Sequence, residues 1–159
     1  MRKNSPYLAL VLFLVGLDQA SKALVEAKVG LYETIPLIKG IFNLTHLRNK
    51  GAILGLFNAA DNRFVPVALG LLAFCAMILV AVYFLRTPAP QKFIRTAFAF
   101  IFTGALGNLI DRVCRGYVID FLEIHVKSFY WPTFNVADSC ITIGAVLLVF
   151  AVFLRRQPA

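Results

Sequence analysis

The apolar residues of this chain gather in four long blocks, and this arrangement most constrains how the chain can fold. The blocks cover about residues 6–25, 64–85, 93–112 and 136–154. Each is long enough to cross a bilayer as a helix, which takes roughly 17–25 residues. A lone span must satisfy its own backbone hydrogen bonds, so all four are predicted to be helical. With 60% hydrophobic and 15% charged residues, the chain is unlike a soluble domain, a disordered chain or a coiled coil.

The basic residues predict how these spans are oriented. Seven Lys and Arg residues, and no Asp or Glu, lie before the first block, between the second and third, and after the fourth. They are Arg2, Lys3, Arg86, Lys92, Arg95, Arg155 and Arg156. By the positive-inside rule both termini are cytoplasmic, and the connections 26–63 and 113–134 lie outside. The net charge of +8 is thus interpreted as an orientation signal, not as a surface for nucleic acid.

The first block follows two basic residues, as the apolar part of a signal peptide would. No small-x-small cleavage site comes after it, so we expect this block to be retained as a span. Residues 41–47 partly alternate and residues 117–122 are β-branched and aromatic, which favours strands in both outer connections. The prediction is one domain, residues 1–159, of the all-α membrane class: four transmembrane helices with a small extracytoplasmic β-rich cradle.

Polar residues inside the spans are costly, at least about 2.5–3.5 kcal/mol each on insertion scales, so each needs a reason. Asp18 and Lys22 are four residues apart and can pair on one helix face, as a structural ion pair or as part of substrate handling. Asn108, Asp111 and Arg112 share a face of the third helix. They either clamp the span to the following loop or line an outer cavity. The glycines and alanine just before them form a small-residue surface for another helix.

Two further acids lie on the outer side. Asn135 suits the N-cap of the fourth helix, with Asp138 at the third position of the first turn, as in a capping box. The same helix end would also favour an ionised Asp138 for chemistry. Asp120 lies between Ile119 and Phe121, an apolar setting that raises the pKa of a carboxyl.

Two carboxylates held together cannot both ionise readily, so one keeps a proton and the other accepts one. This is the arrangement of aspartic proteases. Asp111, Asp120 and Asp138 are the candidates, and spacing alone does not choose between an Asp120–Asp138 and an Asp111–Asp138 pair.

Other functions remain open at this point. Intramembrane acids with a Lys and an Arg also mark proton or ion transporters, although a relay should reach both faces and these acids cluster at one. A scaffold with purely structural polar groups is a third possibility. A cysteine protease would need His125 beside Cys114 or Cys140. No Cys–Cys or His–His spacing matches a zinc site.

Five sequence boxes resemble those of bacterial lipoprotein signal peptidase (signal peptidase II), in that family's order. They are Asp18-Gln19-x-Ser21-Lys22, Asn49-x-Gly51-Ala52, Gly104-Ala105-Leu106-Gly107-Asn108-Leu109-x-Asp111-Arg112, Val118-Ile119-Asp120-Phe121 and Phe134-Asn135-Val136-Ala137-Asp138-Ser139. Together they extend from the first span to the fourth. One departure is Ile53-Leu54, where the family usually has Ala-Phe.

The resemblance implies an intramembrane aspartic endopeptidase without metal or cofactor. Its substrates would be diacylglyceryl-modified prolipoproteins, cut just before the lipidated Cys. It implies that Asp120 and Asp138 are catalytic. Our own hypothesis for the mechanism is that Asp138 activates water and Asp120 holds the proton, although a coupled pair titrates as a unit and the sequence does not say which acid is protonated. The resemblance also implies a multi-pass protein of the bacterial inner membrane, active as a monomer among lipids near the extracytoplasmic face, with a mobile outer segment within 26–63 and inhibition by globomycin. The supporting residues it implies are Asn49, Gly51, Asn108, Asp111, Arg112 and Asn135, with Asp18 and Lys22 as structural polar groups.

Overall fold

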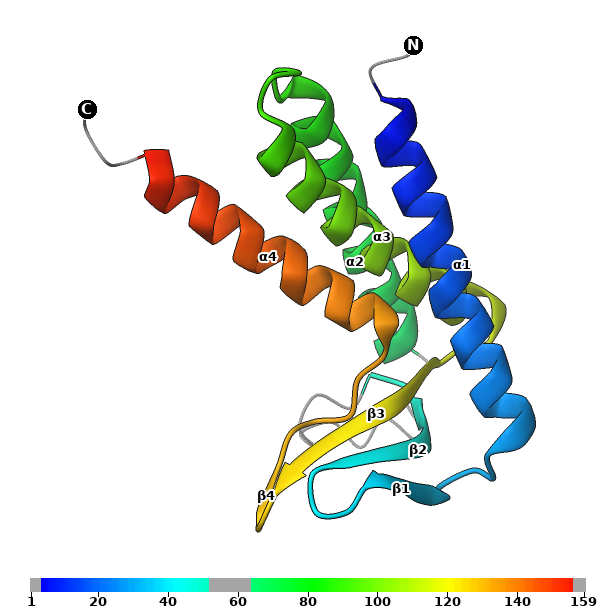
Figure 1. Ribbon diagram of the computed structural model, residues 1–159. Coiled ribbons are helices and arrows are strands. Elements are labelled where there is room, and N and C mark those ends of the chain that lie inside the picture. Colours follow the sequence, from blue (N-terminus) through cyan, green and yellow to red (C-terminus); the bar gives the residue numbers. More distant parts are fainter. Residues whose placement is uncertain (1–3, 52–63, 156–159) are drawn as a thin grey trace.

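The computed structural model describes residues 4–51 and 64–155, and shows a bundle of helices standing on a small sheet (Figure 1). The helices are α1 (Ser5–Lys28), α2 (Phe64–Arg86), α3 (Lys92–Cys114) and α4 (Val136–Arg155). Their bounds agree with the predicted blocks to within three residues at each end. Of the predicted outer segment 26–63, residues 52–63, which include Ile53 and Leu54, lie outside the described part of the chain.

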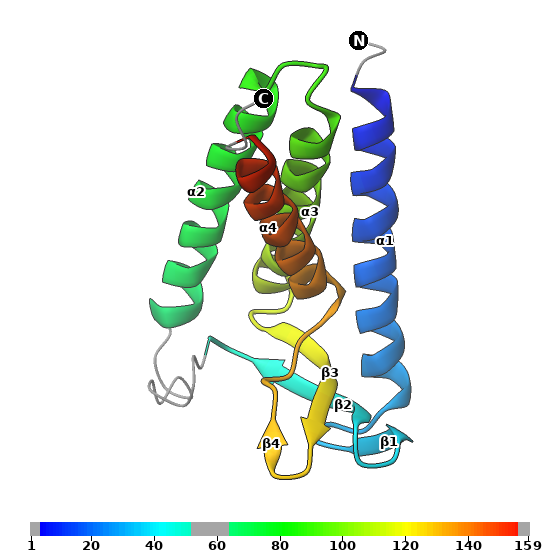
Figure 2. The same cartoon turned by 60° about the vertical axis from the view of Figure 1, so that its left-hand side comes forward.

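The helix α3 is the centre of the bundle and packs against each of the other three helices (Figure 2). Its contact with α4 depends on glycine. A Cβ atom at Gly104 would lie 2.2 Å from the carbonyl oxygen of Ala137, and one at Gly144 would lie 2.7 Å from the carbonyl oxygen of Ala97. The two backbones therefore touch, as the small-residue surface predicts.

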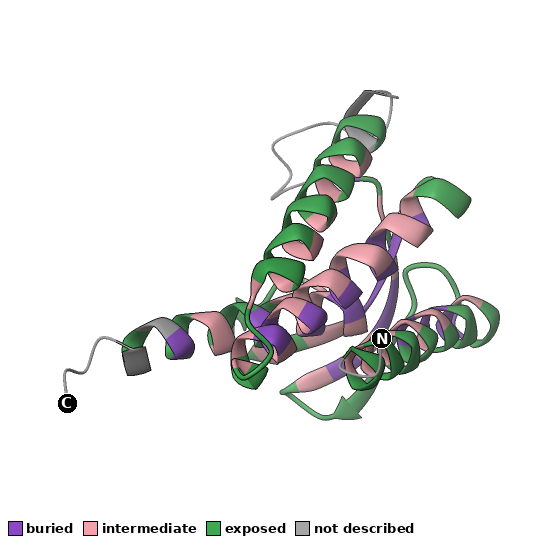
Figure 3. Ribbon diagram, turned by 90° about the horizontal axis from the view of Figure 1, so that it is seen from above, coloured by how far each residue is buried: buried purple, intermediate pink, exposed green. Residues whose placement is uncertain are grey.

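The outward faces of the helices are exposed (Figure 3), and many of the exposed side chains are apolar. Leu12, Leu72 and Phe153 are among many large side chains left exposed, where a soluble protein would present polar groups. Within the described residues, α1, α2 and α3 are long and apolar enough to cross a membrane. The apolar stretch described for α4, Val136–Ala151, is shorter. The molecule is a membrane protein built mainly of helices.

The sheet lies at one end of the bundle and has four antiparallel strands in the order β1-β2-β3-β4. These are β1 (Thr34–Ile38), β2 (Phe42–Asn49), β3 (Val118–Val126) and β4 (Phe129–Tyr130). The two predicted strands correspond to β2 and β3, while β1 and β4 are additional. An apolar cluster fastens the sheet to the end of α1. Its buried members are Val25, Val29, Ile119 and Phe121.

The pairing of β2 with β3 is irregular next to the site. Leu44 opposes Leu122 and Leu47 opposes Asp120, so β2 carries one extra residue between these pairs. Such a bulge bends a strand and redirects the side chains that follow it. The strand then ends at Asn49, opposite Val118, with its side chain within reach of Asp120.

Candidate active site

Asp120 and Asp138 come from different elements, and one buried residue, Asn135, bonds to both of them. Asp120 lies on β3 and Asp138 in the first turn of α4. The side chain of Asn135, just before α4, donates from Nδ2 to Asp120 Oδ1 at 2.8 Å. Its Oδ1 accepts the Asp138 N–H at 2.9 Å, and its own N–H donates to Asp138 Oδ2 at 3.3 Å. These reciprocal bonds with Asp138 are the predicted capping box. Together with the bond to Asp120, they bring both carboxylates to Asn135.

The Asp120 carboxyl is only 3% exposed. Its burial raises the pKa from 3.8 to about 6. The nearby charge of Asp138 also raises this pKa, while the hydrogen bond from Asn49 Nδ2 to Asp120 Oδ2, 3.0 Å long, opposes the change. The apolar setting predicted for this acid is therefore present, and Asp120 holds a proton more readily than an exposed acid.

Asp138 is more exposed and its carboxylate accepts hydrogen bonds on both oxygens. Asn108 Nδ2 donates to Oδ1 at 2.7 Å, and the Asn135 N–H donates to Oδ2. Among the described residues, no Lys or Arg forms an ion pair with Asp138 or Asp120. Both acids are instead held by neutral amides.

Asp111 has a different environment. The fully buried Lys22 ammonium lies 2.9 Å from Asp111 Oδ2 and 2.8 Å from Asp18 Oδ2. Arg115 forms a second ion pair with Asp111. The predicted Asp18–Lys22 pair is thus part of a larger buried cluster. Two cations therefore bind Asp111, whereas no ion pair among the described residues holds Asp120 or Asp138.

The buried cluster also positions the amides around the two acids. Lys22 Nζ donates to Asn108 Oδ1 at 3.1 Å, which turns the Asn108 amide nitrogen toward Asp138. Asp18 Oδ1 accepts the N–H of Ala137, in the first turn of α4, at 2.9 Å. A Cβ at Gly107 would lie 2.6 Å from Asp18 Oδ2, so only glycine leaves room for this carboxylate.

Comparison with known proteins then decides the family. The family model described as Signal peptidase (SPase) II matches residues 10–154. This chain belongs to the signal peptidase II family. The lipoprotein signal peptidase of Geobacter sulfurreducens is 45% identical over 88% of this chain and 86% of its own length. That of Desulforapulum autotrophicum is 40% identical over 91% of this chain and 90% of its own length. The family is one of peptidases, so the transporter alternative has no support.

A solved structure of a bacterial membrane enzyme has the same fold. It superposes with a TM-score of 0.81 at 30% identity, covering 93% of this chain and 92% of its own. A second bacterial membrane enzyme gives a TM-score of 0.79 at 28% identity, covering 98% of this chain and 93% of its own.

Gly51 and Asn49 act together in this member of the signal peptidase II family. Gly51 adopts a φ of 103°, which side-chain-bearing residues rarely reach. This turn lets its N–H donate to Asn49 Oδ1 at 2.8 Å. The oxygen of the Asn49 amide is thereby fixed, and its nitrogen faces Asp120.

Arg112 is half-buried, and its guanidinium lies within electrostatic range of Asp138, Asp120 and Asp111. Its Nη1 donates to the Asn108 carbonyl oxygen at 3.3 Å. Among the described residues it forms no ion pair with any of the three acids, so it is a cation beside the site whose donors are not bonded to a carboxylate.

Two residues of the buried cluster were absent from the predicted site. Gln19 donates to Asp18, to Asp111 and to the Gly107 carbonyl oxygen. It occurs in the first sequence box, but nothing in the sequence indicated its partners. Arg115 follows Asp111 by four residues, a helical spacing that could have revealed the pair.

The cysteine-protease alternative finds no support in the contacts of His125. This imidazole stacks on Tyr130, and its Nδ1 lies 3.4 Å from Asn43 and 4.0 Å from Glu123. Among the described residues, no cluster of His, Cys, Asp and Glu has the composition of a metal site.

Proposed function

We propose that this protein is an intramembrane aspartic endopeptidase that removes signal peptides from diacylglyceryl-modified prolipoproteins. It would cut just before the lipidated Cys, using Asp120 and Asp138. The observation that carries this proposal is that Asn135 donates to both carboxyl groups, from its side-chain Nδ2 to Asp120 and from its backbone N–H to Asp138. Membership of the signal peptidase II family and the names of its lipoprotein signal peptidase relatives support the substrate class.

The mechanism follows from the unequal burial of the two acids. Asp120 is the more deeply buried and holds the shared proton. Asp138, the more exposed partner, takes a proton from a water molecule, which attacks the scissile carbonyl carbon. Asp120 donates its proton to the carbonyl oxygen. As the tetrahedral intermediate collapses, one of its hydroxyl groups returns a proton to Asp120, the proton held by Asp138 passes to the leaving amine nitrogen, and the C–N bond breaks. No metal or organic cofactor is needed for these steps.

The surrounding residues have supporting roles in this proposal. Asn49 and Asn135 position Asp120, and Asn108 positions Asp138. Gly51 fixes Asn49. Arg112 supplies a cation beside the developing negative charge on the substrate.

The membrane arrangement is also part of the proposal. The 20 residues of α4 form the fourth span, in addition to α1, α2 and α3. The basic residues near both ends of the sequence and around the connection between α2 and α3 support a cytoplasmic location for both termini. The sheet and the two acids then lie at the extracytoplasmic face of the inner membrane, where a single chain meets the lipidated Cys among lipids.

A cleavage assay with the reconstituted protein and a diacylglyceryl lipobox peptide tests this function. Asp120→Asn and Asp138→Asn should each abolish cleavage and leave the fold intact, whereas the unlipidated peptide should not be cut. Asp111→Asn is the comparison variant, since it loses an ion-pair partner of Lys22. Full activity in either dyad variant excludes this pair. Loss of chemistry in a folded Asp111→Asn protein would assign the second acid to Asp111.

A further inference from the structure

A second buried charge lies at the end of the bundle away from the sheet. Arg95, in the first turn of α3, is only 5% exposed. Its Nη2 donates to Asn4 Oδ1 at 2.6 Å, and its guanidinium carbon lies over the rings of Tyr7 and Phe84, 4.9 and 4.5 Å from their centroids. Among the described residues, the buried Nε has no hydrogen-bond partner.

This cation has no carboxylate near it in the sequence. Residues 4–17, 64–110 and 139–155, which include this end of all four helices, contain no Asp or Glu. Buried charges in proteins are normally paired, and leaving one unpaired is costly. The positive end of the α3 dipole adds to the imbalance, because Arg95 and Lys92 both lie in its first turn and Gln91 gives no side-chain cap. The local field therefore favours an anion.

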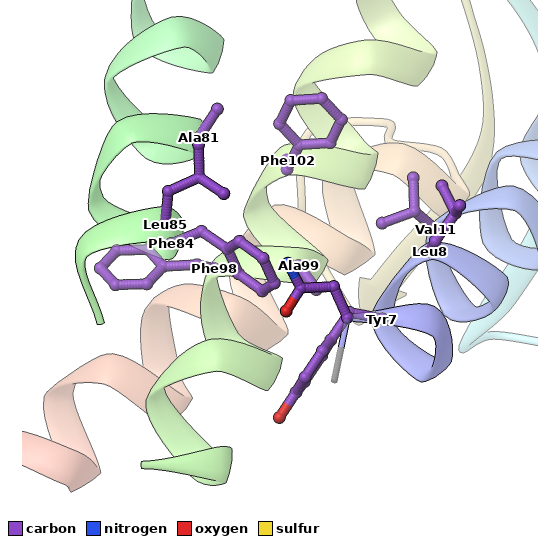
Figure 4. Close-up of a pocket in the computed structure, with 10 residues that line it drawn as sticks. Tyr7, Leu8, Val11, Ala81, Phe84, Leu85, Phe98, Ala99 and Phe102 are labelled. Atoms are coloured by element: carbon purple, nitrogen blue, oxygen red, sulfur yellow. The ribbon is translucent and has the colours of Figure 1, made fainter. Parts of the chain in front are cut away.

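An apolar crevice begins at the same place and runs between α1, α2 and α3 (Figure 4). Its volume is about 330 Å³, within the range of small-molecule sites. Three of its lining residues, Asn4, Tyr7 and Phe84, are the partners of Arg95. The other lining side chains are apolar, among them Val11, Leu85 and Phe102. The cation of Arg95 thus lies next to an apolar channel, and the two share Asn4, Tyr7 and Phe84.

The positive charge at this end of the bundle indicates which kind of molecule would occupy the crevice. A signal peptide begins with a basic segment, which Arg95, Lys92 and Arg86 would repel. A zwitterionic lipid offers no net negative charge. An anionic phospholipid offers both a phosphate and an acyl chain, and anionic lipids are concentrated in the cytoplasmic leaflet, which this end faces in the proposed orientation.

We propose that this crevice binds one anionic phospholipid, with an acyl chain between α1, α2 and α3 and the phosphate on Arg95. The site lies at the opposite end of the bundle from Asp120 and Asp138, so this lipid is distinct from the lipidated substrate.

Native mass spectrometry of the purified protein with phosphatidylglycerol or phosphatidylcholine of identical acyl chains tests this proposal. The protein should retain one phosphatidylglycerol in preference to phosphatidylcholine. Arg95→Gln should weaken phosphatidylglycerol binding roughly tenfold, the value expected for one charge-assisted contact, and remove the preference. Lys92→Gln, which removes an exposed cation from the same helical turn, should retain the preference.

A second pair of variants tests the acyl-chain channel without changing charge. Ala81→Phe fills the crevice and should expel the lipid, whereas Ala76→Phe, on the exposed face of the same helix, should not. This pair also decides the matter if Arg95→Gln does not fold. The proposal is overturned if wild-type protein shows no preference for phosphatidylglycerol, or if Ala81→Phe retains the lipid. It is equally overturned if a folded Arg95→Gln binds as wild type does, or if Lys92→Gln weakens binding as much as Arg95→Gln.

Discussion

Replacing Asn49 by alanine should change the pH at which the proposed peptidase works. The Asn49 amide donates to Asp120 Oδ2 at 3.0 Å and is the largest influence that lowers the pKa of Asp120. This bond stabilises the charged carboxylate. Without it, burial and the charge of Asp138 act with less opposition, so Asp120 keeps its proton to a higher pH.

The size of the effect follows from the bond that is lost. A hydrogen bond to a charged group contributes about 1.5–3 kcal/mol, and one pKa unit corresponds to about 1.4 kcal/mol. The proposed mechanism needs Asp120 protonated, so activity falls as the pH rises through the pKa of the pair. In Asn49→Ala this alkaline limb should therefore move upward by about 1–2 pH units, whatever happens to the maximal rate.

The assay is kcat/KM for the lipidated peptide measured between pH 4 and 9 in both proteins. Asn43→Ala is the matched control, because Asn43 donates at 2.6 Å to Glu123, its pairing partner on the same two strands. That variant should leave the limb in place. An unchanged or lowered alkaline limb in an active Asn49→Ala protein would refute the assignment of the proton to Asp120.

Three other variants test the packing and the buried charges. Lys22→Met leaves the buried carboxylates of Asp18 and Asp111 without their shared cation. The free energy of unfolding in detergent should fall by about 3–5 kcal/mol. An effect below about 1 kcal/mol would contradict the ion-pair cluster. Gly104→Val places a Cβ atom against the Ala137 carbonyl and should lower the stability of the folded protein by at least about 1–3 kcal/mol. Thermal unfolding measures this loss. The control is the lipid-facing Gly70→Val, whose Cβ meets no atom within 4 Å. Between about pH 4 and 6 the folded protein holds a proton on Asp120 that the unfolded chain releases. The stability of the wild-type protein should therefore fall by up to about 3 kcal/mol as the pH rises through this range. Asp120→Asn should flatten this pH dependence, and an unaltered pH dependence would assign it to other groups.

The helices could be predicted closely because long apolar runs admit few other structures in a membrane protein. The capping box of α4 was equally local, since Asn135 and Asp138 are three residues apart. The strands β2 and β3 were visible in their side-chain pattern. β1 was not, because all five of its residues are exposed and it contains Pro36, so neither alternation nor burial marks it.

The site was harder to predict because it is assembled from distant segments. Spacing could not choose between Asp111 and Asp120 as partner of Asp138. The distinguishing contact is Lys22 with Asp111, between helices whose packing no local pattern encodes. The resemblance to signal peptidase II supplied Asp120, and the neutral amides around that acid are consistent with its choice. The catalytic role itself remains a prediction.

The hydrogen bond from Ala137 to Asp18 links residues 119 positions apart. During synthesis the chain emerges from its N-terminus, so α1 enters the membrane while both Asp111 and the start of α4 are still unmade. Asp18 and Lys22 can then form an ion pair with each other. The Asn108 side chain that bonds to Lys22 is made with the third helix, and the Ala137 N–H that bonds to Asp18 is made with the fourth. A partly synthesised chain therefore lacks Asp138 and the first turn of α4. The two acids of the proposed site come together only when the last helix has been made.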